Sequence, residues 1–187
     1  MRRLTILLGL FLALPFAVRA QDSKFELFGG YSYTHVSDSS GATFNFNGGA
    51  ADVGFFPVKW IGAVAEFNYA ESNGYNFGGE FFTAPTHSLT YAGGPRVRFS
   101  VGRVTPYVQV LFGAVHRSNL ETGEEEIAAP QTTFGYSVGG GLDFKLAHHF
   151  SVRLVQASYL HTGFTSPNFG ANPVQNDFNI QTGIVIH

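Results

Sequence analysis

The chain has 187 residues, of which 13% are charged and 16% aromatic, with 23 glycines and no cysteine. A soluble domain usually carries about a quarter charged residues, so this composition predicts a surface that water does not cover. The formal net charge is −2 and the charges are scattered. Nucleic acid is therefore not an expected partner, because binding to it requires a basic stripe.

The N-terminal segment has the three parts of a secretory signal. A positively charged start precedes an apolar run over residues 4–18 that is too short to span a bilayer comfortably, and small residues follow where a signal peptidase cuts. We expect residues 1–20 to be a signal peptide cleaved between Ala20 and Gln21, and residues 21–187 to form one domain. The alternative is a membrane anchor, but the flank and the length do not favour it.

Eight segments follow in which apolar and polar residues alternate with period two, and helical periodicity is absent. The clearest is the sixth, where Phe134 and Tyr136 alternate with Ser137. The seventh slips phase near Val155 and Gln156, which predicts a β-bulge. The expected strands cover residues 24–35, 47–56, 61–69, 87–99, 106–117, 133–145, 150–164 and 177–187.

The links between these strands alternate in length. Short turns on one side and long loops on the other are typical of outer-membrane barrels. An even number of strands then leaves both termini at the short-turn side, which predicts periplasmic termini and extracellular long loops. The short links are residues 57–60, 100–105 and 146–149, and the long ones are residues 37–45, 70–86, 118–132 and 165–176.

The apolar faces of the strands are long, aromatic and uncharged, whereas the opposite faces carry glycine, serine and the ionic groups. Eight strands close a lumen just wide enough for side chains to fill, so large aromatic residues are not expected inside. Closure also pairs every backbone group, which lipid requires, and about 10 residues per tilted strand suffice to cross. The sequence therefore predicts an all-β fold, an eight-stranded antiparallel up-and-down transmembrane β-barrel.

The polar faces carry four acidic and four basic residues. A buried charge without a partner is very costly, so we expect these residues to pair inside the barrel. Such a network serves either as a gate or as a plug that fills and rigidifies the lumen, and the small barrel size favours the plug. The predicted lumen charge network is Glu26, Asp52, Glu66, Arg96, Arg98, Asp143, Lys145 and Arg153.

Aromatic residues near both ends of the strands predict two girdles at the membrane interfaces. The predicted girdle beside the short turns is Trp60, Phe99, Tyr107 and Phe150, and the one toward the long loops is Tyr33, Tyr69 and Tyr91.

Two patterns were considered as chemical sites. His149 and Ser151 have the spacing of a histidine–serine pair, but a catalytic pair needs a carboxylate to orient the histidine, and no acid lies between Ser151 and Asp177. Four histidines near the long-loop ends are candidates for a metal-binding rim, but their spacing brings no two together locally. We therefore expect no catalytic, metal or cofactor site. The four histidines are His35, His87, His116 and His161.

Four segments together resemble the small porin-like outer-membrane barrels related to the OmpA transmembrane domain. The resemblance covers nearly all of the mature chain and implies an outer-membrane location, with insertion by the barrel-assembly machinery. Such barrels usually end on an aromatic residue, whereas this chain ends on His187. The segments are KFELFGGYSYTH, VGGGLDFKL, FSVRLVQASYLHTGF and NDFNIQTGIVIH.

These features predict a non-enzymatic outer-membrane protein with a structural or surface-interaction role in the bacterial envelope and a lumen filled by side chains. The expected partners are outer-membrane lipid and lipopolysaccharide, and the expected state is a monomer. One alternative is a narrow pore or a transporter-like binder of small hydrophobic molecules, which requires an open lumen or a gap between strands. Another is a secreted soluble barrel, such as a lipocalin-like carrier, which requires solubility without detergent.

Overall fold

The computed structural model describes residues 24–37, 43–118, 120–122, 125–128, 131–163 and 174–187. The predicted signal peptide and its cleavage site between Ala20 and Gln21 lie outside the described residues. Among the described residues, no helix is long and apolar enough to cross a bilayer.

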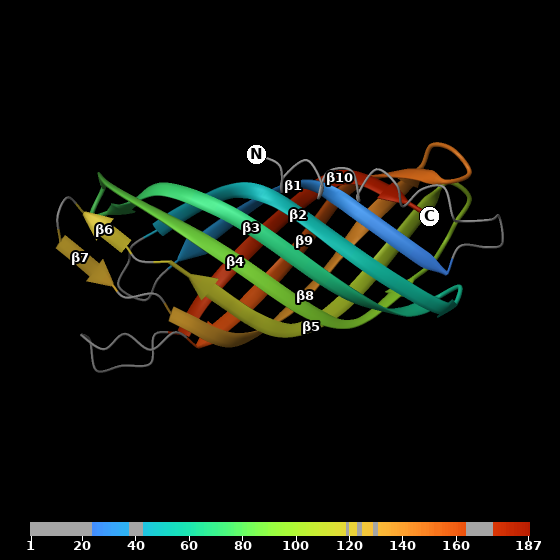
Figure 1. The fold of residues 1–187 in the computed structure, drawn as a ribbon. Helices are drawn as coiled ribbons and strands as arrows, with labels where there is room; N and C mark the ends of the chain where they lie inside the picture. Colours follow the sequence, from blue (N-terminus) through green and yellow to red (C-terminus); the bar gives the residue numbers. More distant parts are fainter. Residues whose placement is uncertain (1–23, 38–42, 119, 123–124, 129–130, 164–173) are drawn as a thin grey trace, which may run out of the picture.

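Eight long strands close into one antiparallel barrel in which each strand pairs with its two neighbours (Figure 1). The strand order around the barrel is β1-β10-β9-β8-β5-β4-β3-β2, and a separate two-stranded sheet contains β6 and β7. The predicted fold class is confirmed. The barrel strands are β1 (Phe25–Ser37), β2 (Thr43–Val58), β3 (Ile61–Phe77), β4 (Glu80–Arg98), β5 (Val104–Arg117), β8 (Gln131–Lys145), β9 (Phe150–Gly163) and β10 (Val174–Ile186), and the small sheet is β6 (Leu120–Thr122) and β7 (Glu125–Ala128).

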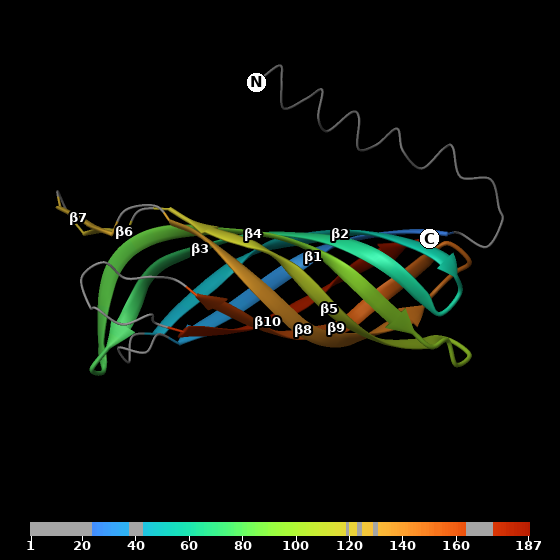
Figure 2. The same cartoon turned by 90° about the horizontal axis from the view of Figure 1, so that it is seen from below.

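The links fall into two sets at opposite ends of the barrel. The links β2–β3, β4–β5 and β8–β9 lie at the end that also holds the last residue, which we call the short-turn end. The other end carries the β3–β4 turn and the β6–β7 hairpin, and we call it the long-loop end (Figures 1 and 2).

The expected long loop over residues 70–86 is wrong, because most of it is paired strand. β3 and β4 continue their pairing to Phe77 and Glu80 and are joined by Gly78 and Gly79, whose φ angles are 61° and 90°. Two successive residues with positive φ suit the two-residue hairpin turn whose twist matches the strands. Similarly, the expected loop over residues 118–132 contains the short β6–β7 hairpin.

β9 contains the expected bulge, one residue from the predicted place. Arg153 pairs with Asp143 and Val155 pairs with Leu142, so Leu154 has no residue opposite it. The extra residue changes the phase of β9. Leu154 and Val155 both face outward, whereas Arg153 and Gln156 are both buried inside the barrel.

The outer face of the barrel is apolar and aromatic, and the lumen is polar, as predicted. Exposed side chains include Phe67 and Phe112, while Asp52, Arg96 and Arg153 are at most 1% exposed. Seven residues were predicted to form the aromatic girdles, and Tyr107 is the one that the structure places inside the barrel, 4% exposed. Tyr107 lies two residues before Gln109 in β5, so the two side chains are on the same face of the strand and both point inward.

The expectation that large aromatic residues are excluded from the lumen is wrong. Phe28, Phe46, Phe56 and Tyr107 are all buried there. Neighbouring glycines leave the space that these rings occupy. A Cβ atom at Gly30 or Gly183 would lie within 3 Å of the Phe28 ring, and Gly54, Gly62 and Gly141 stand in the same relation to Phe56 and Tyr107.

We predict that Gly30→Ala destabilises the barrel by about 1–3 kcal/mol, the usual effect of overpacking a filled interior. The new methyl group would clash with the carbonyl oxygen of Thr182 and with the Phe28 ring. Chemical unfolding in detergent, together with the heat-modifiable shift on gels, measures the loss. The matched control is Gly29→Ala on the outer face, where a Cβ meets nothing within 4 Å. Equal stability of the two variants would contradict the packing that we describe.

Candidate functional site

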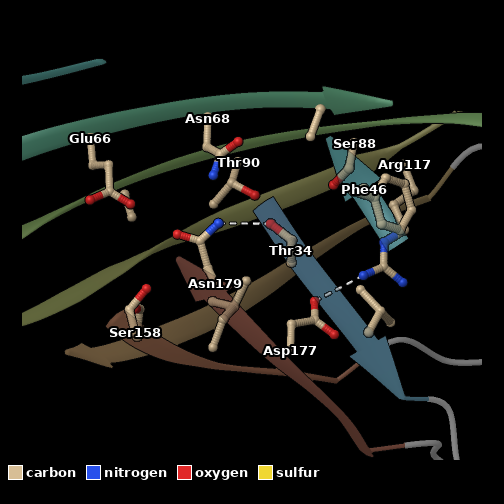
Figure 3. A pocket seen from close by; sticks show the side chains of 15 residues that line it. Thr34, Phe46, Glu66, Asn68, Ser88, Thr90, Arg117, Ser158, Asp177 and Asn179 are labelled. Carbon is tan, nitrogen blue, oxygen red and sulfur yellow. Dashed lines mark hydrogen bonds and ion pairs between the residues drawn. The ribbon is translucent and has the colours of Figure 1, made fainter. Parts of the chain in front are cut away.

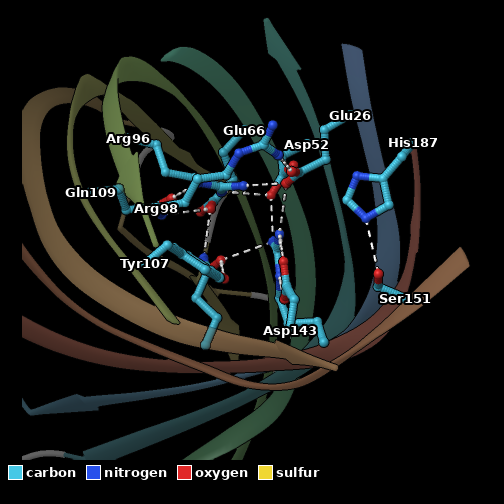
Figure 4. Close-up of polar contacts among 12 residues, drawn as sticks. Glu26, Asp52, Glu66, Arg96, Arg98, Tyr107, Gln109, Asp143, Ser151 and His187 are labelled. Carbon is cyan, nitrogen blue, oxygen red and sulfur yellow. Dashed lines mark hydrogen bonds and ion pairs between the residues drawn. The ribbon is translucent and has the colours of Figure 1, made fainter. Parts of the chain in front are cut away.

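The lumen at the short-turn half is crossed by ion pairs that start from the Arg153 guanidinium. This group, on β9, donates to Asp143 at 2.9 Å, to Asp52 at 2.6 Å and to Glu26 at 3.2 Å. Its three partners come from β8, β2 and β1, so the bonds connect strands on different sides of the barrel (Figure 4). Arg153 is completely buried, and a guanidinium in such a place needs several acceptors because it cannot lose its charge.

Arg96 and Arg98 on β4 bind the same acidic residues from the opposite wall. Arg96 donates to Glu26 at 2.8 Å and to Asp52 at 2.9 Å, while Arg98 donates to the second oxygen of Glu26 at 2.7 Å. Glu26 therefore bridges three arginines. The result is a continuous charge-paired layer, and each bond in it is stronger than a neutral hydrogen bond.

Two glutamines connect this layer to Glu66. Arg96 Nε donates to Gln109 Oε1 at 2.8 Å, and Gln109 Nε2 donates to Glu66 at 3.3 Å. Arg153 donates to Gln156 Oε1 at 3.0 Å, and Gln156 Nε2 donates to Glu66 at 2.8 Å. Because arginine can only donate, it fixes both amides with their NH₂ groups directed at Glu66.

The buried arginines also stack on the lumen aromatics. The Arg98 guanidinium lies 3.6 Å from the centroid of the Phe56 ring, and that of Arg153 lies 4.2 Å from the Phe28 ring. Arg96 and Arg153 approach the Tyr107 ring from 4.5 and 4.8 Å. These cation–π contacts are attractive, especially away from water, and they fill space that ion pairs alone would leave.

The structure brings six of the eight predicted charged residues into direct ion pairs. They are Glu26, Asp52, Arg96, Arg98, Asp143 and Arg153.

The other two predicted residues differ. Glu66 is buried but accepts hydrogen bonds from three glutamine amides, of Gln109, Gln156 and Gln181. Lys145 is exposed, because it is the last residue of β8 and lies where the lumen meets solvent. The prediction that Lys145 belongs to the network is therefore wrong, because the alternation of a strand shows which face a residue occupies and not how far along the barrel axis it lies.

Sequence reasoning missed a second ion pair toward the long-loop end. Arg117 on β5 donates to Asp177 on β10 at 2.9 Å. Arg117 is the last residue of β5 and Asp177 lies near the start of β10, and these two strands are distant in sequence. The sequence pattern also places Gln109, Gln156 and Gln181 on the lumen face, but it does not show that they contact Glu66.

A small cavity lies between Glu66 and the Arg117–Asp177 pair (Figure 3). Its volume is about 30 Å³, enough for only a few water molecules. Most of the lining surface is apolar, with residues such as Phe46 and Leu160, and the rest comes from hydroxyl, amide and charged groups. The polar lining includes Thr34, Asn68, Ser88, Thr90, Ser137, Ser158 and Asn179.

The candidate pair His149 and Ser151 is not assembled as a site. Ser151 is buried and lies 3.0 Å from the Nε2 of His187, not from His149. The β9 alternation explains this, because Ser151 points into the lumen while His149 belongs to the exposed turn.

The four rim histidines face outward, each beside a polar or aromatic neighbour. Two of them, His87 and His116, lie on the neighbouring strands β4 and β5, two residues apart in register. His35 lies 2.7 Å from Asn45 and His87 lies 3.2 Å from the Tyr69 hydroxyl. His116 lies 2.7 Å from Thr132, and His161 packs on Tyr136. Within the described part of the chain, no three histidine or acidic side chains are close enough to hold a metal ion.

We predict that Arg153→Gln lowers the free energy of unfolding by about 3–5 kcal/mol, because it leaves three buried carboxylates without their shared partner. Reversible unfolding in detergent or lipid vesicles measures the change. Lys145→Gln is the control, and its effect is expected to stay within about 0.5 kcal/mol because that side chain is exposed. A small effect of Arg153→Gln would mean that the network is not needed to hold the barrel together.

Comparison with known proteins places this architecture among small barrels. A search of curated protein sequences finds no significant match. Among solved structures, Neisserial surface protein A matches with a TM-score of 0.65 and 14% identity, covering 88% of this chain and 97% of that one. OprG from Pseudomonas aeruginosa matches with a TM-score of 0.62 and 13% identity, covering 87% and 94%.

The attachment invasion locus protein Ail of Yersinia pestis matches with a TM-score of 0.56 and 14% identity, covering 86% of this chain and 97% of that one. At these identities the likeness shows the fold alone. The family model described as outer membrane protein beta-barrel domain matches residues 4–184. The chain belongs to the outer membrane protein beta-barrel domain family.

Proposed function

We propose that this protein is a sealed, non-enzymatic outer-membrane barrel with a structural or surface-interaction role in the bacterial envelope. The observation that carries the proposal is the charge-paired layer across the lumen. Arg153 and Arg96 connect β1, β2, β4, β8 and β9 through buried ion pairs, so a solute passing along the axis would have to break several of them at once.

The same layer favours the plug over the gate. A gate needs an alternative partner for at least one member of the network, so that a bond can be exchanged at small cost. Here each arginine already binds two or more acceptors, and aromatic rings cover the guanidinium faces. Breaking one of these bonds leaves a buried donor or acceptor without its partner, at a cost in free energy, and this supports a single closed arrangement.

The transporter-like alternative has less support. A lateral path for hydrophobic molecules needs a gap between strands, and the bulge in β9 is the only irregularity that suggested one from sequence. Around the bulge, β9 keeps its pairing with both β8 and β10, and the Thr182 hydroxyl donates to the Arg153 carbonyl at 2.9 Å. The bulge therefore acts in our proposal as the device that turns both Arg153 and Gln156 inward.

A catalytic role is also not proposed. In the part of the chain that the structure describes, the buried Ser151 and the half-buried His187 are the nearest approach to a nucleophile and base. Among the described residues, no carboxylate is hydrogen-bonded to the His187 ring, and such a group is the usual orienting member. We assign the pair to closing the short-turn end of the lumen.

In the orientation that we propose, the short-turn end with both termini faces the periplasm and the long loops face outward. The basis is the general asymmetry of outer-membrane barrels. The chain would contact lipid and lipopolysaccharide through its apolar outer face, insert through the barrel-assembly machinery, and act as a monomer, because the barrel leaves no unpaired edge to join another copy.

We predict that the purified protein gives no steady ion current in planar lipid bilayers. The physical reason is the layer of buried ion pairs that fills the lumen. Single-channel recording tests this, with a large porin reconstituted in the same way as a positive control and a heat-modifiable gel band to show that the barrel is folded. Regular conductance steps from the folded protein would contradict the sealed barrel.

The orientation can be tested by labelling single introduced cysteines, because the sequence has no cysteine of its own that would react. We predict that Glu80→Cys, beside the β3–β4 turn, is labelled by a membrane-impermeant maleimide on intact cells. Ala147→Cys, in the β8–β9 turn, is expected to react only after the outer membrane is opened. Both positions are exposed in the structure. Labelling of Ala147→Cys alone on intact cells would reverse the orientation.

A further inference from the structure

Glu66 is a buried acid that no guanidinium among the described residues contacts. Its carboxylate accepts three hydrogen bonds, all from glutamine Nε2 groups, and the side chain is 7% exposed. Because Arg96 and Arg153 fix the orientation of Gln109 and Gln156, the amides offer donors only. Both carboxylate oxygens of Glu66 therefore face hydrogen-bond donors.

Charge inside the described part of the barrel does not balance. The buried or nearly buried acids are Glu26, Asp52, Glu66, Asp143 and Asp177, and the guanidinium groups are Arg96, Arg98, Arg117 and Arg153. This leaves one carboxylate more than there are guanidinium groups. A lone buried charge is costly, and Glu66 is the acid that lacks an ionic partner.

The cavity beside Glu66 offers further oxygen atoms. Thr90 and Ser158, which Figure 3 labels, line it with hydroxyl groups, and so does Ser137. Asp177 lines the opposite side, 1% exposed, and its Oδ1 has no hydrogen-bond partner among the described residues. The carboxylates at its two sides and the hydroxyl groups between them are electron-donating oxygens. The rest of the lining is mostly apolar and includes Arg117, which donates to Asp177.

We propose that this cavity binds one small monovalent cation, potassium, sodium or ammonium, with Glu66 as its charge partner. The ion would restore the charge balance of the lumen and use oxygen ligands of the kind that hard cations prefer. A volume of about 30 Å³ admits a bare ion with at most a few waters and excludes sugars and larger organic amines. The single excess charge matches a monovalent ion.

The test is an NMR titration of the folded protein in micelles with potassium chloride and, separately, with ¹⁵N-ammonium chloride, at constant ionic strength set by choline chloride. Choline is too large for the cavity and serves as the reference cation. We expect saturable shifts at Thr90, Ser137 and Ser158. Glu66→Gln is expected to weaken binding by about tenfold or more, since it removes the charged partner of the cation.

The matched control is Glu71→Gln, which removes an exposed acid from the same strand, β3, and is expected to bind like the unchanged protein. Ser137→Ala with Ser158→Ala removes two cavity hydroxyls without touching the ion pairs. It is expected to weaken binding several-fold, so it tests the site even if Glu66→Gln fails to fold.

Three outcomes would overturn the proposal. They are shifts that choline reproduces, equal saturation in a folded Glu66→Gln variant, and unchanged affinity in the double serine variant. Saturation by calcium at lower concentration than potassium would overturn the assignment to a monovalent ion.

Discussion

When eight strands close into a barrel, every second side chain points into a narrow lumen that water cannot fill freely. The charged groups in this lumen therefore have to form ion pairs and hydrogen bonds with one another. The barrel answers this constraint with guanidinium groups that each serve several acceptors. Arg153 binds acids from β1, β2 and β8, and Glu26 in turn joins Arg96, Arg98 and Arg153. The lumen is therefore a connected polar core, and the ladder of backbone hydrogen bonds around it is stabilised from inside as well as by closure.

The shape of that core depends on the pairing of aromatic residues with glycine. A phenylalanine inside a small barrel needs a neighbour without a side chain, and Phe28 has Gly30 and Gly183 while Phe56 has Gly54 and Gly62. The guanidinium groups stack on these rings. That of Arg98 lies 3.6 Å from the Phe56 centroid, and that of Arg153 lies 4.2 Å from the Phe28 centroid. The glycines, the aromatic rings and the buried charges of the lumen therefore depend on one another for their packing.

Much of the fold could be predicted from the sequence because period-two alternation directly reports which face a residue occupies. The eight strands, their inward charges and the bulge of β9 follow from that pattern. Depth along the barrel does not, which is why Lys145 was placed inside although it stands at the exposed end of β8. The sequence of the β3–β4 extension predicts a loop because asparagine and glycine obscure its alternation, whereas the structure shows that Gly78 and Gly79 supply a tight turn.

Partner choice inside the lumen is a property of the closed barrel and has no local signal. Gln109, Gln156 and Gln181 lie on β5, β9 and β10, and only closure directs all three amides at Glu66. Gln109 and Gln156 connect the arginine layer to Glu66 without an ion, because each accepts from arginine on one side and donates to Glu66 on the other. Gln181 accepts from Gln156 and also donates to Glu66. The lumen thus divides into a half closed by ion pairs and a half whose negative charge remains available. A cation held at Glu66 would strengthen the sealed layer through the glutamines rather than pass through it, so binding and sealing are compatible functions of one polar core.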